Sequence, residues 1–283
     1  LYYLIVCCFF NIGLDLLFVL VFHMGIAGAA IATVLSQAVS AILVLLALIR
    51  TSDIYKLHLR KVRFFEGSLS SILRIGIPAG LQAAMYSLSN IIIQTALNAL
   101  GTDTVAAWTS FGKMDAFCWM VISAFGISAT TFVGQNYGAG KYDRVRKSVR
   151  VCLGMTLASS IAMSIFLMTA GKYLFHLFTS DPEVIRIGIQ ILNYMAPAYA
   201  LFVFIEIYSG ALRGIGDVII PTIMTCCGVC VFRTLWVFLL VPKSPTIETI
   251  TLSYPISWGI TAVLFIIYYY KKQKKLGMEN FDQ

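Results

Sequence analysis

Charged residues are scarce in this chain. Only 12% of its 283 residues are charged, whereas a soluble domain usually carries about a quarter. Hydrophobic residues make up 59% of the sequence, and the mean hydropathy is +0.85. A water-soluble fold of this length could not bury so much apolar surface, because much of any folded surface still faces solvent. The composition therefore predicts an integral membrane protein.

Histidine and clustered acids are also scarce, which argues against an enzyme. The three histidines, His23, His58 and His176, lie far apart in the sequence, and the seven cysteines all lie in apolar runs. A membrane enzyme would need clustered histidines, paired carboxylates or a Ser/His/Asp set near one face. We interpret the cysteines as small buried hydrophobic residues. The sequence therefore predicts a non-enzyme with no metal site and no cofactor other than a coupling ion.

The sequence has no signal-peptide architecture. It begins with Leu1 rather than Met and opens inside an apolar run, without a basic region or a cleavage site. We therefore expect the natural N-terminus to lie upstream, so that the chain is N-terminally truncated.

Long apolar runs are what the sequence has instead. They are continuous rather than alternating over ten residues, which predicts an all-α membrane bundle and not a β-barrel. Each run exceeds the roughly 20 residues that cross the hydrocarbon core. The eight predicted spans are 1–22, 26–49, 71–99, 104–134, 148–171, 184–212, 218–240 and 250–270.

The distribution of positive charge predicts the topology. Of the 21 Lys and Arg residues, 16 lie on one side of the eight predicted crossings. Most of them fall in the predicted linker 50–70, in residues 141–150 and in the tail 271–283. By the positive-inside rule these segments are cytoplasmic. The net charge of +8 is thus explained by the membrane, without a nucleic-acid partner.

Polar residues recur every four positions along the span 71–99. This spacing places them in one slowly spiralling stripe, roughly 24 Å long, on one helix face. Lipid disfavours such a stripe, so it should face water or protein. Two interpretations remain open, a cavity lining and helix–helix hydrogen bonds. The stripe consists of Gln82, Tyr86, Asn90, Gln94 and Asn98.

Glu206 is the only glutamate well inside a predicted span, about two turns before Arg213. A buried carboxylate either pairs with a cation, takes up a proton or binds a metal cation. A coupling or substrate role and a static ion pair therefore both remain open. Pro197 in the same span should kink the helix, because proline removes a backbone donor.

Four further charged positions within spans are candidates. Lys113 and Asp115 are two residues apart, which places them on opposite faces of one helix. Arg233 lies at a similar predicted depth, so we hypothesise that Asp115 pairs with Arg233 and that Lys113 and Arg233 border a cavity. Asp15 shares a face with Asn11, and both a functional polar pair, with Asp15 as a candidate for ion coupling, and a structural pair remain open.

Several motifs in order resemble the multidrug and toxic compound extrusion (MATE) transporters. The strongest is Val133-Gly134-Gln135-Asn136-Tyr137-Gly138-Ala139-Gly140-Lys141, which closes a span and opens a basic loop. The others are Asn11-x-x-x-Asp15 with Gly28-Ala29-Ala30-Ile31-Ala32-Thr33, Ile75-Gly76-Ile77-Pro78-Ala79-Gly80, Leu212-Arg213-Gly214-x-Gly216-Asp217, Arg233, and Tyr254-Pro255-x-x-Trp258.

The resemblance implies two lobes of six helices each. On that mapping residues 1–49 hold the last two helices of the first lobe and residues 71–270 form the complete second lobe. It also implies a monomer in the cell membrane that exports organic cations or other amphiphiles in exchange for Na⁺ or H⁺. The chain departs from the family at two places. The acid of the first helix lies outside it, and Tyr86 stands where some members have an acid on the seventh helix.

A lipid flippase of the same superfamily, such as one for lipid-linked oligosaccharides, is the alternative function. Such a protein would need a large, strongly cationic cavity. Lys113 and Arg233 are the few basic residues expected inside the membrane, which argues against it.

Overall fold

The computed structural model describes residues 2–53, 55–63 and 65–275, and these residues are helical almost throughout, without a strand. The all-α membrane class predicted from the sequence is confirmed. The chain divides into two compact units, residues 1–69 and residues 70–283. Within the predicted linker and tail, residues 54, 64 and 276–283 lie outside the described residues.

The first unit is a pair of apolar helices. Helix α1 (Tyr2–Leu16) runs on into a π-helical turn (Leu17–Val21), and helix α2 follows (Gly25–Arg50). Most of their large apolar side chains are exposed, as expected of surfaces that face lipid. Gly25 enters α2 with φ of +55°, a left-handed conformation that glycine adopts without steric cost.

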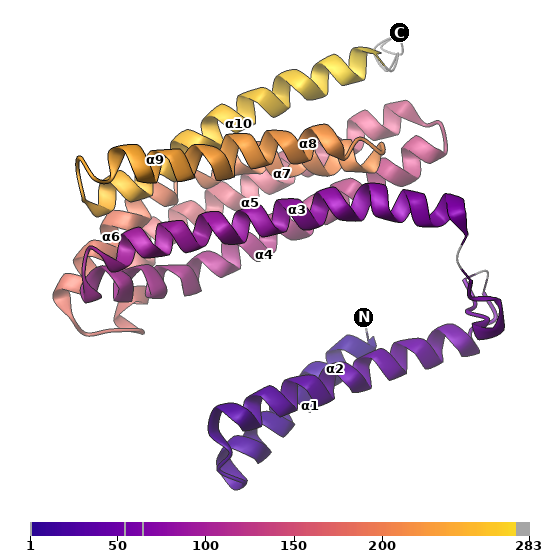
Figure 1. Ribbon diagram of the computed structural model, residues 1–283, viewed down its shortest axis with the longest axis horizontal. Coiled ribbons are helices and arrows are strands. Elements are labelled where there is room, and N and C mark those ends of the chain that lie inside the picture. Colours follow the sequence, from indigo (N-terminus) through magenta and orange to yellow (C-terminus); the bar gives the residue numbers. More distant parts are fainter. Residues whose placement is uncertain (1, 54, 64, 276–283) are drawn as a thin grey trace. The chain divides into compact units, whose positions relative to one another are not determined.

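The second unit is a bundle built from the remaining helices (Figure 1). Its elements are α3 (Glu66–Asn98), α4 (Thr102–Gly138), α5 (Tyr142–His176), α6 (Pro182–Met195), α7 (Tyr199–Gly214), α8 (Ile219–Thr225), a π-helical stretch (Cys226–Val231), α9 (Phe232–Leu240) and α10 (Ile247–Lys275). Helix α3 begins a few residues before the boundary between the units.

The number of spans differs from the eight predicted. Six helices among the described residues are long and apolar enough to cross a membrane, and α6 with α7 adds a seventh as one bent span. Helix α3 has 33 residues and is therefore long enough, but it is not among these apolar helices. Its polar stripe is the reason that composition alone does not select it.

The bend between α6 and α7 follows from Pro197, as the sequence predicted. The two helices meet at 50° across a break that contains this proline. Proline has no backbone N–H, so the regular hydrogen bonding is interrupted there. The buried hydroxyl of Ser164 on α5 donates to the carbonyl of Ala196 at 2.6 Å, which satisfies an acceptor at the break.

Helices α4 and α7 approach each other closely through small residues. A Cβ atom added to Gly210 would lie 2.7 Å from the carbonyl oxygen of Gly126, and one added to Gly214 would lie 2.8 Å from that of Thr130. Distances this short leave no room for a side chain. The backbones therefore pack directly, which is how small residues let membrane helices associate.

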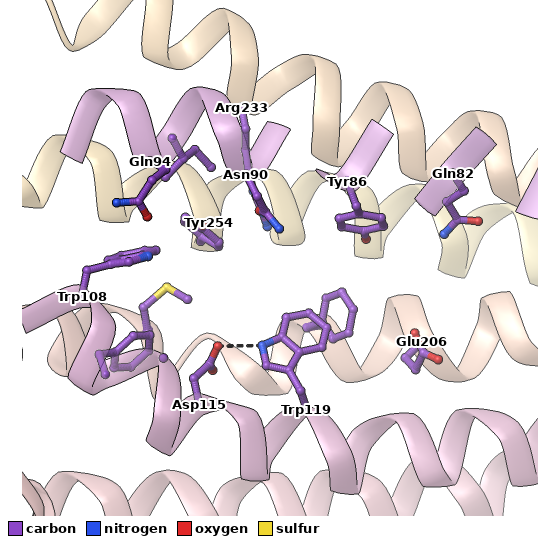
Figure 2. Close-up of a pocket in the computed structure, with 15 residues that line it drawn as sticks. Gln82, Tyr86, Asn90, Gln94, Trp108, Asp115, Trp119, Glu206, Arg233 and Tyr254 are labelled. Atoms are coloured by element: carbon purple, nitrogen blue, oxygen red, sulfur yellow. Dashed lines mark hydrogen bonds between the residues drawn. The ribbon is translucent and has the colours of Figure 1, made fainter. Parts of the chain in front are cut away.

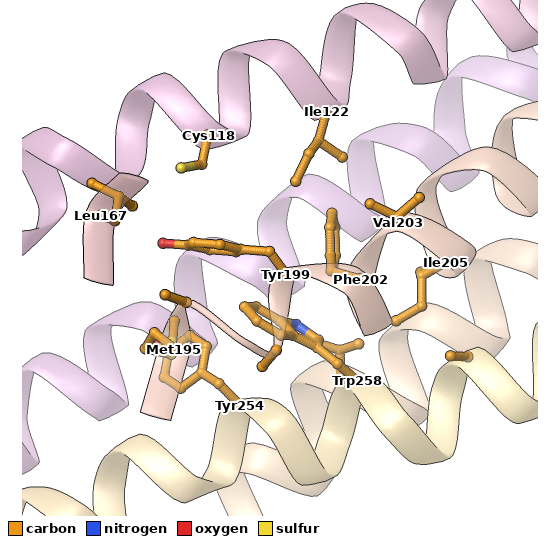
Figure 3. Close-up of a cluster of buried hydrophobic side chains, with 14 of the residues drawn as sticks. Cys118, Ile122, Leu167, Met195, Tyr199, Phe202, Val203, Ile205, Tyr254 and Trp258 are labelled. Atoms are coloured by element: carbon orange, nitrogen blue, oxygen red, sulfur yellow. The ribbon is translucent and has the colours of Figure 1, made fainter. Parts of the chain in front are cut away.

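An aromatic cluster fills the middle of the bundle (Figure 3). Trp258 of α10 and Tyr199 of α7 are almost completely buried, and the rings of Tyr199 and Phe202 both pack against Trp258. The ring of Trp119 on α4 stands edge-on to Phe202 with centroids 4.4 Å apart. Such large rings fix the spacing of α4, α7 and α10.

The loop after α7 is tied to the end of α10. The carboxylate of Asp217 accepts a hydrogen bond from the Tyr268 hydroxyl at 2.7 Å and pairs with the Lys272 ammonium group at 2.7 Å. Gly216 turns the chain with φ of +83° immediately before. These two contacts join the Gly-x-Gly-Asp turn to the last helix.

Candidate functional site

The second unit contains a cavity of about 490 Å³ bordered by α3, α4, α6, α7, α9 and α10. Figure 2 shows its lining side chains, which face one another from these helices. The volume falls within the range of sites for drug-sized molecules. Aromatic and apolar side chains form much of the wall, and a few polar groups converge on it.

Helix α3 supplies an uncharged polar side of the cavity. Gln82, Tyr86, Asn90 and Gln94 all line it, so most of the predicted stripe faces this space. Asn98, the last member of the stripe, is not part of the lining; its side-chain oxygen accepts a hydrogen bond from Gln94 at 2.9 Å. The stripe thus combines a cavity face with one hydrogen bond within its own helix.

Asp115 of α4 lies in the cavity wall and is held by two donors. The indole N–H of Trp119 donates to one carboxylate oxygen at 2.8 Å, and the hydroxyl of Tyr199 donates to the other. Trp119 is one helical turn further along α4, whereas Tyr199 comes from α7. The carboxylate is therefore oriented by both helices that border it.

Glu206 of α7 is the second carboxylate of the cavity. Its Oε1 lies 3.7 Å from a guanidinium nitrogen of Arg213, near the outer limit of an ion pair, and its side chain is 21% exposed. A Cβ atom added to Gly126 would lie 2.7 Å from Glu206 Cγ. The glycine of α4 thus makes the space that this glutamate occupies.

Arg233 of α9 also lines the cavity, and it is 3% exposed. Its Nε donates to the Ser257 hydroxyl at 3.1 Å, and its guanidinium lies 3.8 Å from the centroid of the Tyr254 ring. The buried Nη2 has no hydrogen-bond partner among the described residues. The guanidinium is thus fixed by an aromatic face and a hydroxyl.

The hypothesised pair between Asp115 and Arg233 is wrong as a direct contact. Among the described residues Asp115 bonds to Trp119 and Tyr199, and Arg233 bonds to Ser257. Two near donors already engage both carboxylate oxygens. The two charges therefore border the same cavity without an ion pair between them.

Two other charged candidates lie elsewhere. The Lys113 ammonium group lies over the ring of Phe178, 5.2 Å from its centroid, and Lys113 does not line the cavity. Asp15 belongs to the first unit, where its buried Oδ1 has no hydrogen-bond partner among the described residues. The Nδ2 of Asn11, on the same face, is likewise unpartnered there.

Three aromatic residues that form walls of the cavity were not identified from the sequence. Trp108 and Trp119 of α4 and Tyr254 of α10 all line the cavity. The spacing of Trp108, Gly112, Asp115 and Trp119 is four, three and four residues, which places them on one helix face. This regular spacing of tryptophans around an acid is the feature of the sequence that could have predicted the aromatic wall formed by α4.

Comparison with known proteins decides the family. The model of the MatE family matches residues 78–239, which is more than half of the chain. The chain belongs to the MatE family. It is therefore a multi-pass membrane protein of a transporter family.

Relatives from bacteria and human agree with this membership. The chain is 30% identical to the probable multidrug resistance protein YpnP of Bacillus subtilis over 206 aligned residues. The aligned segment covers 73% of the chain and 46% of YpnP. The chain is 27% identical to the human multidrug and toxin extrusion protein 1, over 73% of the chain and 36% of that protein. The chain thus spans about half the length, or less, of these relatives.

Solved structures agree on the MatE fold. A MOP superfamily transporter from Pyrococcus furiosus matches 98% of this chain and 62% of its own length, with a TM-score of 0.90 at 21% identity. A multidrug resistance MATE family transporter in an outward-facing conformation also matches 98% of this chain and 62% of its own length, with a TM-score of 0.89 at 21% identity.

Proposed function

We propose that this MatE protein is a secondary-active antiporter that exports organic cations or other amphiphiles in exchange for Na⁺ or H⁺. The observation that carries the proposal is the cavity within the membrane bundle, which combines aromatic walls with two carboxylates. Relatives named for multidrug resistance and multidrug export support it.

The cavity chemistry suits flat, positively charged molecules. Trp108, Trp119 and Tyr254 offer aromatic faces, which attract both apolar rings and cations. Asp115 and Glu206 supply the negative charge. A site of this kind binds by area and charge rather than by a fixed hydrogen-bond pattern, so it accepts many related amphiphiles.

Ion coupling would act through the same carboxylates by alternating access. A Na⁺ ion or a proton that neutralises Glu206 or Asp115 changes the relative free energies of the two arrangements of the bundle. Glu206 is the stronger candidate, because its only charged contact among the described residues is the long one to Arg213. Asp115 is more firmly held by two donors.

The lipid-flippase alternative finds less support in the cavity. Arg233 is the single basic residue among its lining residues, and two acids share that lining. A strongly cationic cavity for phosphate-bearing lipids would need more basic groups than acids.

We propose that the protein lies in the plasma membrane. In the proposed orientation the basic loops and the C-terminal end are on the cytoplasmic side. The support is the charge distribution of the loops, which follows the positive-inside rule. We further propose that the protein acts as a monomer.

The test is export of a cationic dye from efflux-deficient cells that express the complete coding sequence. Glu206→Gln removes the charge with little change of shape and should lower export at least about tenfold, which corresponds to ~1.4 kcal/mol. Glu183→Gln is the matched control, since Glu183 is 50% exposed and pairs with Arg186 on the surface. Wild-type export from the Glu206→Gln variant would remove this residue from the mechanism, and no export by the wild type would contradict the function itself.

A further inference from the structure

Arg233 carries a positive charge that no described residue neutralises. The nearest groups are a hydroxyl and aromatic rings: Nε donates to Ser257, and the guanidinium lies over Tyr254 at 3.8 Å and near Trp258 at 5.4 Å. A guanidinium keeps its proton in proteins, so burial does not remove the charge. A buried charge without a counter-ion is costly, which makes this position a candidate for a ligand.

The guanidinium of Arg233 is the group that a ligand in the cavity would meet. Its Nη2 is buried and has no hydrogen-bond partner among the described residues. The contacts to Ser257 and Tyr254 hold the planar group in one orientation. A fixed, charged donor at a cavity wall suits a carboxylate or a similar anionic acceptor.

The two acids occupy the side of the cavity that faces Arg233. In Figure 2, Arg233 and Asn90 are on one side of the cavity, and Asp115, Trp119 and Glu206 lie across the space from them. Neither acid forms a direct ion pair with Arg233. The cavity therefore has one basic group on one side and two acids on the other, with an aromatic ring beside each charge, Tyr254 at Arg233 and Trp119 at Asp115.

We propose that Arg233 is a specificity-determining residue that binds the anionic group of an amphiphilic substrate. The substrate class is then a zwitterion, with a carboxylate at Arg233, a cationic group toward Asp115 or Glu206, and a flat body among the rings. This inference rests on the proposed transport function and adds the chemistry of its substrates. A purely cationic molecule would gain nothing from Arg233 and would be repelled by it.

Two dyes that differ in one group test the proposal. The first is a rhodamine with a free carboxylate, which is a zwitterion, and the second is its methyl ester, which is a pure cation. Binding to the purified protein, made from the complete coding sequence, is measured by fluorescence for both dyes, and export is measured in cells. The wild type should bind the free acid at least as tightly as the ester.

Arg233→Gln should weaken binding of the free acid roughly tenfold to a hundredfold, the range expected for a lost charged hydrogen bond. Binding of the ester should stay the same or tighten, because a repelling charge is removed. Arg233→Lys keeps the charge and should retain part of the preference for the free acid. Arg186→Gln, which removes an exposed arginine, is the control and should change neither dye.

Three outcomes would overturn the proposal. One is a wild type that prefers the ester by tenfold, which needs no variant. Another is an equal loss of both dyes in Arg233→Gln, since that would make Arg233 a packing residue. The third is a free-acid affinity that Arg233→Gln leaves unchanged. Failure of the transport function is separate, because it would appear as dye binding without export of either dye.

Discussion

The two halves of α4 meet their neighbours in opposite ways. Residues 108–119, here the open half, carry Trp108, Asp115 and Trp119 and border the cavity. Residues 126–134, the closed half, carry Gly126, Thr130 and Gly134 and touch the backbone of α7. The same helix is therefore held apart from its neighbours by large rings at one end and pressed against α7 at the other. Residue size along one face sets where the bundle opens.

Glu206 lies at the junction of the two halves. It lines the cavity, yet its side chain fills the space beside Gly126, at the start of the closed half. A change in the charge of Glu206 would thus act at the point where the packing of α4 and α7 changes from open to closed. This position suits a group that couples ion binding to helix movement.

The largest effect should come from filling the closed half. In Gly210→Ala the new Cβ would lie 2.7 Å from the Gly126 carbonyl oxygen, so α4 and α7 must separate. We expect a loss of stability of about 1–3 kcal/mol and a matching loss of export. Thermal unfolding in detergent measures the first, and dye export measures the second.

Gly154→Ala on α5 is the control for that substitution, because a Cβ atom there would meet nothing within 4 Å. Alanine is the better helix former by about 1 kcal/mol, so this variant should be as stable as the wild type or slightly more stable. Equal effects of the two alanines would show that α4 and α7 are not in close contact.

A smaller effect should follow from Asp115→Asn in the open half. The amide retains one acceptor oxygen, so Tyr199 and Trp119 cannot both keep their present bonds. We expect roughly tenfold slower export and a stability loss of about 1–2 kcal/mol. Asp103→Asn, at an exposed position in the first turn of α4, should leave both unchanged. A fully active Asp115→Asn variant would exclude this carboxylate from coupling.

The smallest effect should come from Asp217→Asn, in the loop that follows α7. The variant loses the ion pair with Lys272 but keeps an acceptor for the Tyr268 hydroxyl. Because Lys272 is 30% exposed, solvent weakens the pair, and we expect a stability loss of about 0.5–1 kcal/mol. Salt screens such pairs, so the difference from the wild type in unfolding temperature should shrink at high ionic strength. A difference that is independent of salt would contradict an ionic contribution.

The sequence predicted the parts of the site that depend on local spacing. The four-residue repeat placed Gln82 to Gln94 on one face, and Pro197 located the bend, because both follow from the geometry of a single helix. Contacts between helices could not be predicted in this way. Depth alone suggested that Asp115 would meet Arg233, but rotation of each helix brings Tyr199 and Tyr254 to them instead.

The surroundings of the aromatic residues and of Lys113 also depend on more than one helix. Trp108 and Trp119 of α4 and Tyr254 of α10 belong to the site because these two helices converge, and no single residue shows that convergence. Lys113 was expected at the cavity, yet its helix face directs it to Phe178. Local periodicity gives the face of a helix, whereas the partner of that face depends on the packing of the whole bundle.

Ion-driven dye uptake into proteoliposomes tests the central claim most directly. The complete protein is reconstituted, a Na⁺ or H⁺ gradient is imposed, and accumulation of the cationic dye ester is followed by fluorescence. The account predicts accumulation that vanishes when the gradient is dissipated and that Glu206→Gln abolishes. Accumulation that proceeds equally without a gradient, or that Glu206→Gln leaves intact, would contradict an ion-responsive cavity.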